Sequence, residues 1–141
     1  MDKTIKTIND DNFEIDNITG QFFNVFNNTS HRQPDWTILD KICIDKIIII
    51  KKTGLTETVY DLVSFIEPRK LILTNGTLTD FQEMEVAEVT KVVGHIAQRH
   101  SNYKKSGNLN GTYFEGTGTK LFQFIKTVTG WKISSVIWED N

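Results

Sequence analysis

Apolar residues first recur with a helical period and later with the alternating period of β-strands. The first helical stripe recurs at three- and four-residue spacing and consists of Ile15, Ile18, Phe22 and either Val25 or Phe26. This spacing predicts a helix that ends near Asn27. Asp11 is suited to be its N-cap, because Glu14 stands three residues further on, where it can reach back to the cap backbone. We therefore expect the helix to begin at about Asp11.

Two further helices and one strand are expected before the middle of the chain. Asp35 follows Pro34 and is suited to cap a short helix whose inward residues are Trp36, Leu39 and Ile42. Residues 44–52 contain four consecutive isoleucines, whose branched side chains favour a strand covered on both faces and ended by Thr53-Gly54. A third helix is expected from Thr56, and Pro68 should interrupt it.

The second half of the chain is predicted to be β-rich. After a turn at Asn75-Gly76, strands are expected over residues 77–92, 96–104, 117–127 and 131–138, with glycines between them. Helices followed by antiparallel strands are typical of an α+β protein whose bent sheet wraps over helices on one side. Residues 1–10 alternate only weakly and are expected to form a flexible arm ahead of one domain over residues 11–141.

A two-residue hairpin turn at Gly94-His95 would decide which side chains share a face of the sheet. Odd-numbered residues before the turn would then lie beside even-numbered residues after it. One face would carry Glu83, Glu85, Gln98, His100 and Asn102; the other would carry Glu88, Arg99, Ser101 and Tyr103. Neither face is purely apolar, so the pattern does not decide which one faces the helices.

Composition excludes several classes of protein. The chain has 141 residues with a net charge of −2, so it is long enough for one core and lacks the cationic excess of a nucleic-acid-binding surface. A single cysteine, Cys43, excludes an internal disulfide, and three histidines without ligand spacing predict no metal site. Phosphate-binding and dinucleotide motifs are absent, so no cofactor is expected. The longest apolar run is too short for a membrane span and the first residues lack a signal-peptide core, so we expect a cytoplasmic protein without membrane contact.

The order of the elements resembles the NTF2-like superfamily, the cystatin-like α+β cone shared by ketosteroid isomerases, SnoaL-type cyclases, scytalone dehydratase and many DUF4440-type proteins. The resemblance is carried by the segments 22–26, 36–42, 45–50, 118–126 and 130–134. It extends over residues 12 to 139. It implies a strongly bent antiparallel sheet with the N-terminal helices in its concavity, and a homodimer formed through the outer face of the sheet.

The resemblance also implies a ligand pocket inside the cone. Its side of the last strands would carry Leu121 and Gln123, while Phe122 and Phe124 would face outward toward a second copy. The predicted ligand-binding residues are Phe22, Phe26, Trp36, Gln98, Leu121, Gln123 and Trp138. Glu83 and His100 are the candidate proton acceptors. The expected ligand is a small, mostly apolar molecule.

Two other functions stay open at this point. The first is an enzyme of the isomerase, cyclase or dehydratase type that moves a proton at a carbonyl substrate. The isomerase mechanism does not transfer directly, because Phe22-Phe23 occupies the place of its tyrosine and Ile49-Ile50-Lys51 the place of its carboxylate. The second is a non-catalytic dimeric interaction module. A buried carboxylate or imidazole facing an open cavity would favour the enzyme.

Overall fold

The protein is an α+β chain in which helices pack against one six-stranded sheet. The computed structural model describes residues 3–141, with side chains from Asp10 onward. Its elements are α1 (Lys3–Asn24), η1 (Thr29–His31), α2 (Thr37–Ile42), β1 (Cys43–Thr53), β2 (Thr56–Tyr60), α3 (Leu62–Thr74), β3 (Leu78–Val93), β4 (Ile96–Leu109), β5 (Thr112–Thr127) and β6 (Gly130–Asp140). None of the described helices is long and apolar enough to cross a membrane.

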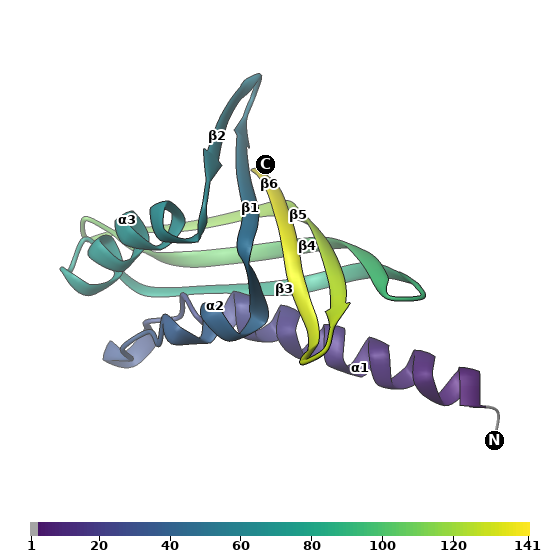
Figure 1. Cartoon of the computed structure of the whole chain (residues 1–141). Helices are drawn as coiled ribbons and strands as arrows, with labels where there is room; N and C mark the ends of the chain where they lie inside the picture. Colours follow the sequence, from purple (N-terminus) through teal and green to yellow (C-terminus); the bar gives the residue numbers. More distant parts are fainter. Residues whose placement is uncertain (1–2) are drawn as a thin grey trace.

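The sheet has the strand order β2-β1-β6-β5-β4-β3. Every neighbouring pair is antiparallel except β1 and β6, which run parallel. Figure 1 shows the sheet strongly bent, so that β1 and β2 stand steeply to the long strands β3 and β4. Helices α1 and α2 lie along the concave face, and α3 lies at one end of it (Figure 1). The expected α+β cone is confirmed.

Helix α1 begins at Lys3, eight residues before the predicted start. Asp11 is therefore not an N-cap but a residue inside the helix, only 5% exposed. Its Oδ1 accepts hydrogen bonds from Trp131 Nε1 and from Lys126 Nζ, each at 2.9 Å. Of the expected arm, residues 1 and 2 lie outside the described residues, and the flexibility of residues 1–10 stays a prediction.

The second helix and the isoleucine strand occur where the sequence predicts them. Asp35 Oδ1 accepts from the Thr37 backbone N–H at 3.1 Å, at the start of α2. Strand β1 ends at Thr53, directly before Gly54, as expected. However, β1 is covered on one face only: Ile47 and Ile49 are buried, whereas Ile48 is 53% exposed. The prediction of a strand covered on both faces is wrong, because the helices occupy only the concave side of the sheet.

The helix expected from Thr56 is wrong in its first part. Residues 56–60 form β2, which pairs with β1 in a hairpin. Helix α3 starts only at Leu62, where the Asp61 side chain accepts from the Ser64 N–H and the Ser64 hydroxyl accepts from the Asp61 N–H. Pro68 lies within α3 and does not end it. The β-branched residues of this segment extend the sheet, and the capping box delays the helix to Leu62.

A β-bulge in β3 changes the predicted face membership. The hairpin turn is as expected, with Gly94 at φ 59° and Val93 opposite Ile96. The register then shifts by one residue between Glu85, which pairs with Tyr103, and Ala87, which pairs with Asn102. A bulge reverses the faces of all residues beyond it. Glu83 and Glu85 consequently lie on the same face as Tyr103 and not with Gln98, as strict alternation predicted.

The last strands also face opposite to the expectation. Phe122 and Phe124 are each 1% exposed and belong to the core, whereas Leu121 is 48% exposed. The Phe122 ring packs edge-on against Phe22 of α1 at 5.4 Å between centroids. Because side chains alternate along a strand, burying the two phenylalanines against α1 turns Leu121 and Gln123 outward. The outward orientation predicted for Phe122 and Phe124 is wrong.

Candidate functional site

A cavity of about 530 Å³ lies between α3, the C-terminal part of α1 and the concave face of the sheet. Its apolar wall includes Phe22, Phe26, Phe65, Leu73, Leu78 and Phe81. Its charged wall consists of Lys51, Arg69, Glu83, Lys105, Lys120 and Asp140. Trp138 completes the lining between the two. The cavity thus has an apolar side and an ionic side.

Aromatic contacts hold the apolar wall in place. Phe22 lies in the last turns of α1, and Phe26 lies in the turn that directly follows the helix. Both pack against Phe65 of α3, with ring centroids at 6.3 Å and 5.7 Å. Trp138 of β6 contacts Phe65 edge-on at 5.7 Å. Phe65 therefore joins α3 to α1 and to the sheet.

The first ion pair of the wall joins Lys120 to Glu83. Lys120 Nζ lies 2.8 Å from Glu83 Oε1, and the two side chains are 7% and 10% exposed. The ammonium group also lies over the Tyr103 ring, 4.3 Å from its centroid. Burial lowers the pKa of Lys120, and the Glu83 carboxylate opposes that shift. The bulge in β3 is what brings Glu83 to this face.

The second ionic group is centred on Asp140. The Tyr103 hydroxyl donates to Asp140 Oδ1, Lys105 Nζ lies 2.9 Å from Oδ2, and Lys51 Nζ lies 4.0 Å from the same oxygen. Burial would raise the pKa of Asp140, but the Tyr103 and Lys105 hydrogen bonds outweigh it and lower the pKa. Burial and the neighbouring carboxylate together raise the pKa of Tyr103. Gly118 permits this contact, because a Cβ there would overlap the Tyr103 hydroxyl.

Arg69 of α3 differs from the other cations of the wall. Its guanidinium Cζ lies 4.1 Å from the Phe65 ring centroid and within 5.4 Å of the centroids of Tyr60 and Trp138. Its Nη1 donates to the Phe65 carbonyl at 3.0 Å. No carboxylate of the described residues lies within 4.0 Å of it. Burial lowers its pKa.

A second charged cluster, outside the cavity, is fully paired. Arg99 is 4% exposed, and it donates Nε and Nη2 to the Glu85 carboxylate at 3.0 Å and 2.5 Å. Its Nη1 donates to Asp16 and to Thr90. These bonds engage the Nε, Nη1 and Nη2 donors of Arg99 within the protein. The cluster ties α1 to β3 and β4.

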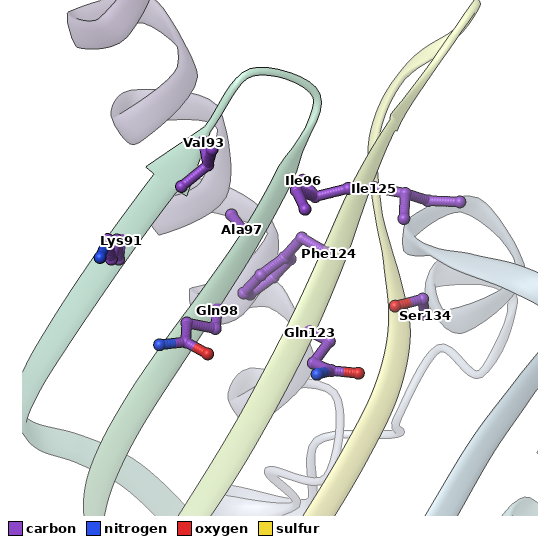
Figure 2. Close-up of a pocket in the computed structure, with 9 residues that line it drawn as sticks. All are labelled: Lys91, Val93, Ile96, Ala97, Gln98, Gln123, Phe124, Ile125 and Ser134. Carbon is purple, nitrogen blue, oxygen red and sulfur yellow. The ribbon is translucent and has the colours of Figure 1, made fainter.

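Three predicted ligand-binding residues and the candidate proton acceptor His100 lie on the opposite face of the sheet. Gln98 and His100 of β4 and Leu121 and Gln123 of β5 are all exposed there. Figure 2 shows Gln98 and Gln123 on neighbouring strands in a shallow depression of about 410 Å³, lined also by Val93, Ile96 and Ile125. The Ser135 hydroxyl donates to Gln123 Oε1 at 3.0 Å. These four residues do not line the concave cavity, because they share the face opposite to the buried Phe122 and Phe124.

The cavity is lined by four of the predicted site residues: Phe22, Phe26, Glu83 and Trp138. Trp36 packs against Phe26, with 5.8 Å between the ring centroids. Whether they bind a ligand stays a prediction. The sequence analysis missed Arg69 and Lys120. Arg69 follows Phe65 by four residues, which places the two side by side on a helix, and Lys120 alternates with Phe122 on one face of a strand. Both signals became readable only once α3 and the inward face of β5 were known.

Comparison with known proteins extends the fold assignment. No family model and no curated protein matches the chain. Among solved structures it is similar to the Kfla4162 protein of Kribbella flavida, with a TM-score of 0.78 and 15% identity over 95% of this chain and 93% of that one. It is also similar to an NTF2-like protein with a cystatin-like fold from Novosphingobium aromaticivorans, with a TM-score of 0.74 and 11% identity over 97% of this chain and 86% of that one. The hexachlorocyclohexane dehydrochlorinase LinA-type3 of Novosphingobium barchaimii is similar with a TM-score of 0.75 and 13% identity over 92% of this chain and 86% of that one.

Proposed function

The chain has the NTF2-like, cystatin-like fold, and on that premise we propose that it binds a small, mostly apolar molecule in the concave cavity. The observation that carries the proposal is the cavity itself. Its volume of about 530 Å³ falls within the roughly 300–1,000 Å³ of ligand pockets in general. A SnoaL-like or DUF4440-type relationship and a cytoplasmic location belong to the same proposal.

The wall supports binding because its two sides have different chemistry. Aromatic rings on α1 and α3 offer an apolar surface, and the ionic side offers few but fixed polar groups. Such a division orients a small molecule that has one polar end. The similar LinA structure is described as a dehydrochlorinase, so this fold also serves enzymes.

Titration with the neutral fluorophore N-phenyl-1-naphthylamine tests the proposal. Ile72 lines the concave cavity and Ile96 lines the depression on the opposite face. Ile72→Trp should weaken binding of the fluorophore by about tenfold or more, because the indole fills space that the probe needs. The matched variant Ile96→Trp should leave the affinity unchanged. If Ile96→Trp abolishes binding and Ile72→Trp does not, the concave cavity is not the binding site.

Acid–base catalysis is a second candidate function, favoured by the Lys120–Glu83 pair in the cavity wall. A carboxylate beside a substrate can take a proton from the carbon next to a carbonyl group, and an ammonium or indole N–H can stabilise the oxygen that becomes negative. Glu83, Lys120 and Trp138 are the groups available for these roles. His100 and Gln123, considered from the sequence, lie on the other face of the sheet.

Deuterium exchange into 2-tetralone, followed by NMR in D₂O, tests this candidate. The wild-type chain should accelerate exchange next to the carbonyl, and Glu83→Gln should remove the acceleration. Glu88→Gln is the matched control, because Glu88 lies outside the cavity lining. An exchange rate equal to that of buffer, or one unaffected by Glu83→Gln, would count against catalysis by this residue.

A further inference from the structure

We infer that the ligand carries an acidic group, and that Arg69 binds it: the cavity takes an amphipathic small molecule with one oxyanion and an apolar body. This inference rests on the proposed function, since it specifies the chemistry of the ligand bound in the same cavity. It assigns to Arg69 a role that the sequence pattern did not suggest.

The first argument is the charge of the cavity wall. Four cationic side chains and two carboxylates line it, which leaves an excess of two positive charges. The whole chain, in contrast, has a net charge of −2. Positive charge is thus concentrated at the cavity in an otherwise acidic protein, and such a local field attracts anions.

The second argument is that the other three cations already have partners. Lys120 is paired with Glu83 at 2.8 Å, and Lys105 and Lys51 share Asp140 at 2.9 Å and 4.0 Å. Arg69 has no carboxylate within 4.0 Å among the described side chains. Glu83 is the carboxylate that acts on it from a distance. A half-buried charge without a counterion is costly, and an incoming anion would remove that cost.

The third argument is the position of the guanidinium. Three aromatic rings surround it: its Cζ lies 5.1, 4.1 and 5.4 Å from the ring centroids of Tyr60, Phe65 and Trp138. Its Nη1 donates to the Phe65 carbonyl, and the Tyr60 side chain is a further hydrogen-bond partner that favours the charged form. A guanidinium has five N–H donors, so donors are left for a carboxylate or sulfonate. Because these contacts already hold the Arg69 side chain in place before binding, little side-chain entropy is lost on forming a two-pronged contact.

The same contacts place the apolar body of the ligand. Phe65 touches Arg69, Phe22 of α1 and Phe26 in the turn after α1. An anion on Arg69 would therefore have its carbon skeleton beside these three rings. Inorganic anions would gain nothing from that wall, so the site should prefer an organic acid over free phosphate.

Two fluorophores of the same shape test the inference. 1-Anilinonaphthalene-8-sulfonate is N-phenyl-1-naphthylamine with an added sulfonate, so the ratio of their affinities measures the contribution of the charge. We expect the wild type to prefer the sulfonate by about tenfold or more, the range of one charge-assisted contact. Arg69→Gln should remove this preference while binding of the neutral fluorophore persists. Lys70→Gln, which removes an exposed charge from the same helix, should keep it.

Arg69→Lys is a second variant that separates loss of the charge from a folding defect in Arg69→Gln. It keeps the positive charge, so it should keep part of the preference for the sulfonate fluorophore. Inorganic phosphate at equal ionic strength should not displace the sulfonate; full displacement would show a site for bare anions and overturn the inference. Equal affinities for the two fluorophores, unchanged by Arg69→Gln, would overturn it while the proposed function stands. If neither fluorophore binds in an Ile72-dependent way, the proposed function and the inference fail together.

Discussion

At the scale of single residues, the described buried ions are paired, and the pairs connect distant parts of the chain. Arg99 joins β4 to Glu85 of β3 and to Asp16 of α1. Lys120 joins β5 to Glu83 of β3. Because each partner is removed from water, losing one leaves the other without compensation. These residues should therefore be more sensitive to substitution than exposed charges.

Arg99→Met should destabilise the fold strongly. The change leaves Glu85, which is 20% exposed on its side chain, without the two guanidinium bonds that compensate its burial. Removing one partner of a buried pair costs about 3–5 kcal/mol in general, and we expect a loss in that range by urea denaturation. The control Lys91→Met removes an exposed charge from the neighbouring strand and should change the free energy of unfolding little. Similar effects for the two variants would contradict the structural role of Arg99.

Asp11→Asn should give a stability loss that depends on pH. Burial alone would raise the pKa of Asp11, but the hydrogen bonds from Trp131 and Lys126 hold it below the ordinary value of 3.8. The carboxylate therefore stabilises the fold above that value, and the contribution is lost as pH falls through the lower pKa of the folded state. We expect Asp11→Asn to cost about 1–2 kcal/mol at pH 7 and the difference from wild type to shrink in acid. Denaturation curves at several pH values measure it; a difference independent of pH would contradict it.

At the scale of elements, helix α3 shows tertiary packing outweighing a local signal that should end a helix. Pro68 is a helix breaker by its chemistry, yet α3 continues through it to Thr74. The helix is held at its start by the Asp61–Ser64 capping box and along its length by Phe65 and Leu73, which are buried. Tertiary contacts of these side chains outweigh the hydrogen bond that proline cannot make.

Pro68→Ala should therefore stabilise the protein. Proline has no backbone N–H, so residue 68 cannot donate to the Ser64 carbonyl one turn earlier in the helix. Alanine supplies that N–H and has a higher helix propensity than proline. We expect a gain of about 1 kcal/mol in the free energy of unfolding, reduced by the greater freedom of the unfolded chain. Pro34→Ala is the matched control: this proline lies in the loop before α2, where no helical bond is restored, and its replacement should give no gain. A gain only for Pro34→Ala would refute this account.

At the scale of the whole molecule, the outer face of the sheet stays uncovered in the single chain. Five of its aliphatic side chains are between 40% and 71% exposed: Ile48, Val89, Ile96, Leu121 and Ile137. Ile137 lies opposite Leu121, and Leu121 opposite His100, which in turn lies opposite Val89. An exposed face that carries this many large aliphatic side chains is typical of an interface. The homodimer remains a proposal, now through Leu121 and its neighbours, since Phe122 and Phe124 are in the core.

Sedimentation velocity at micromolar concentration tests the dimer. The wild type should sediment as a dimer and Leu121→Glu as a monomer, because two symmetry-related carboxylates would be buried at the contact. Leu55→Glu is the control: Leu55 is 97% exposed at the tip of the β1–β2 hairpin, away from that face. A monomeric wild type would contradict the proposal.

The sequence by itself determined the α+β class, the isoleucine strand, the Gly94 hairpin and the inward face of the first helix, because these depend on local periodicity and turn chemistry. It did not determine the faces of β3 and β5 or the extent of α3. A single extra residue at the bulge moved Glu83 and Glu85 to the inside, and the burial of Phe122 moved Gln123 to the outside. Only the tertiary structure decided which faces of β3 and β5 point inward. A pattern of alternating residues does not reveal a bulge, and the packing of Phe122 against α1 is a contact between distant parts of the chain. For the same reason Arg69, placed at the cavity by the packing of α3, could not be found from the sequence.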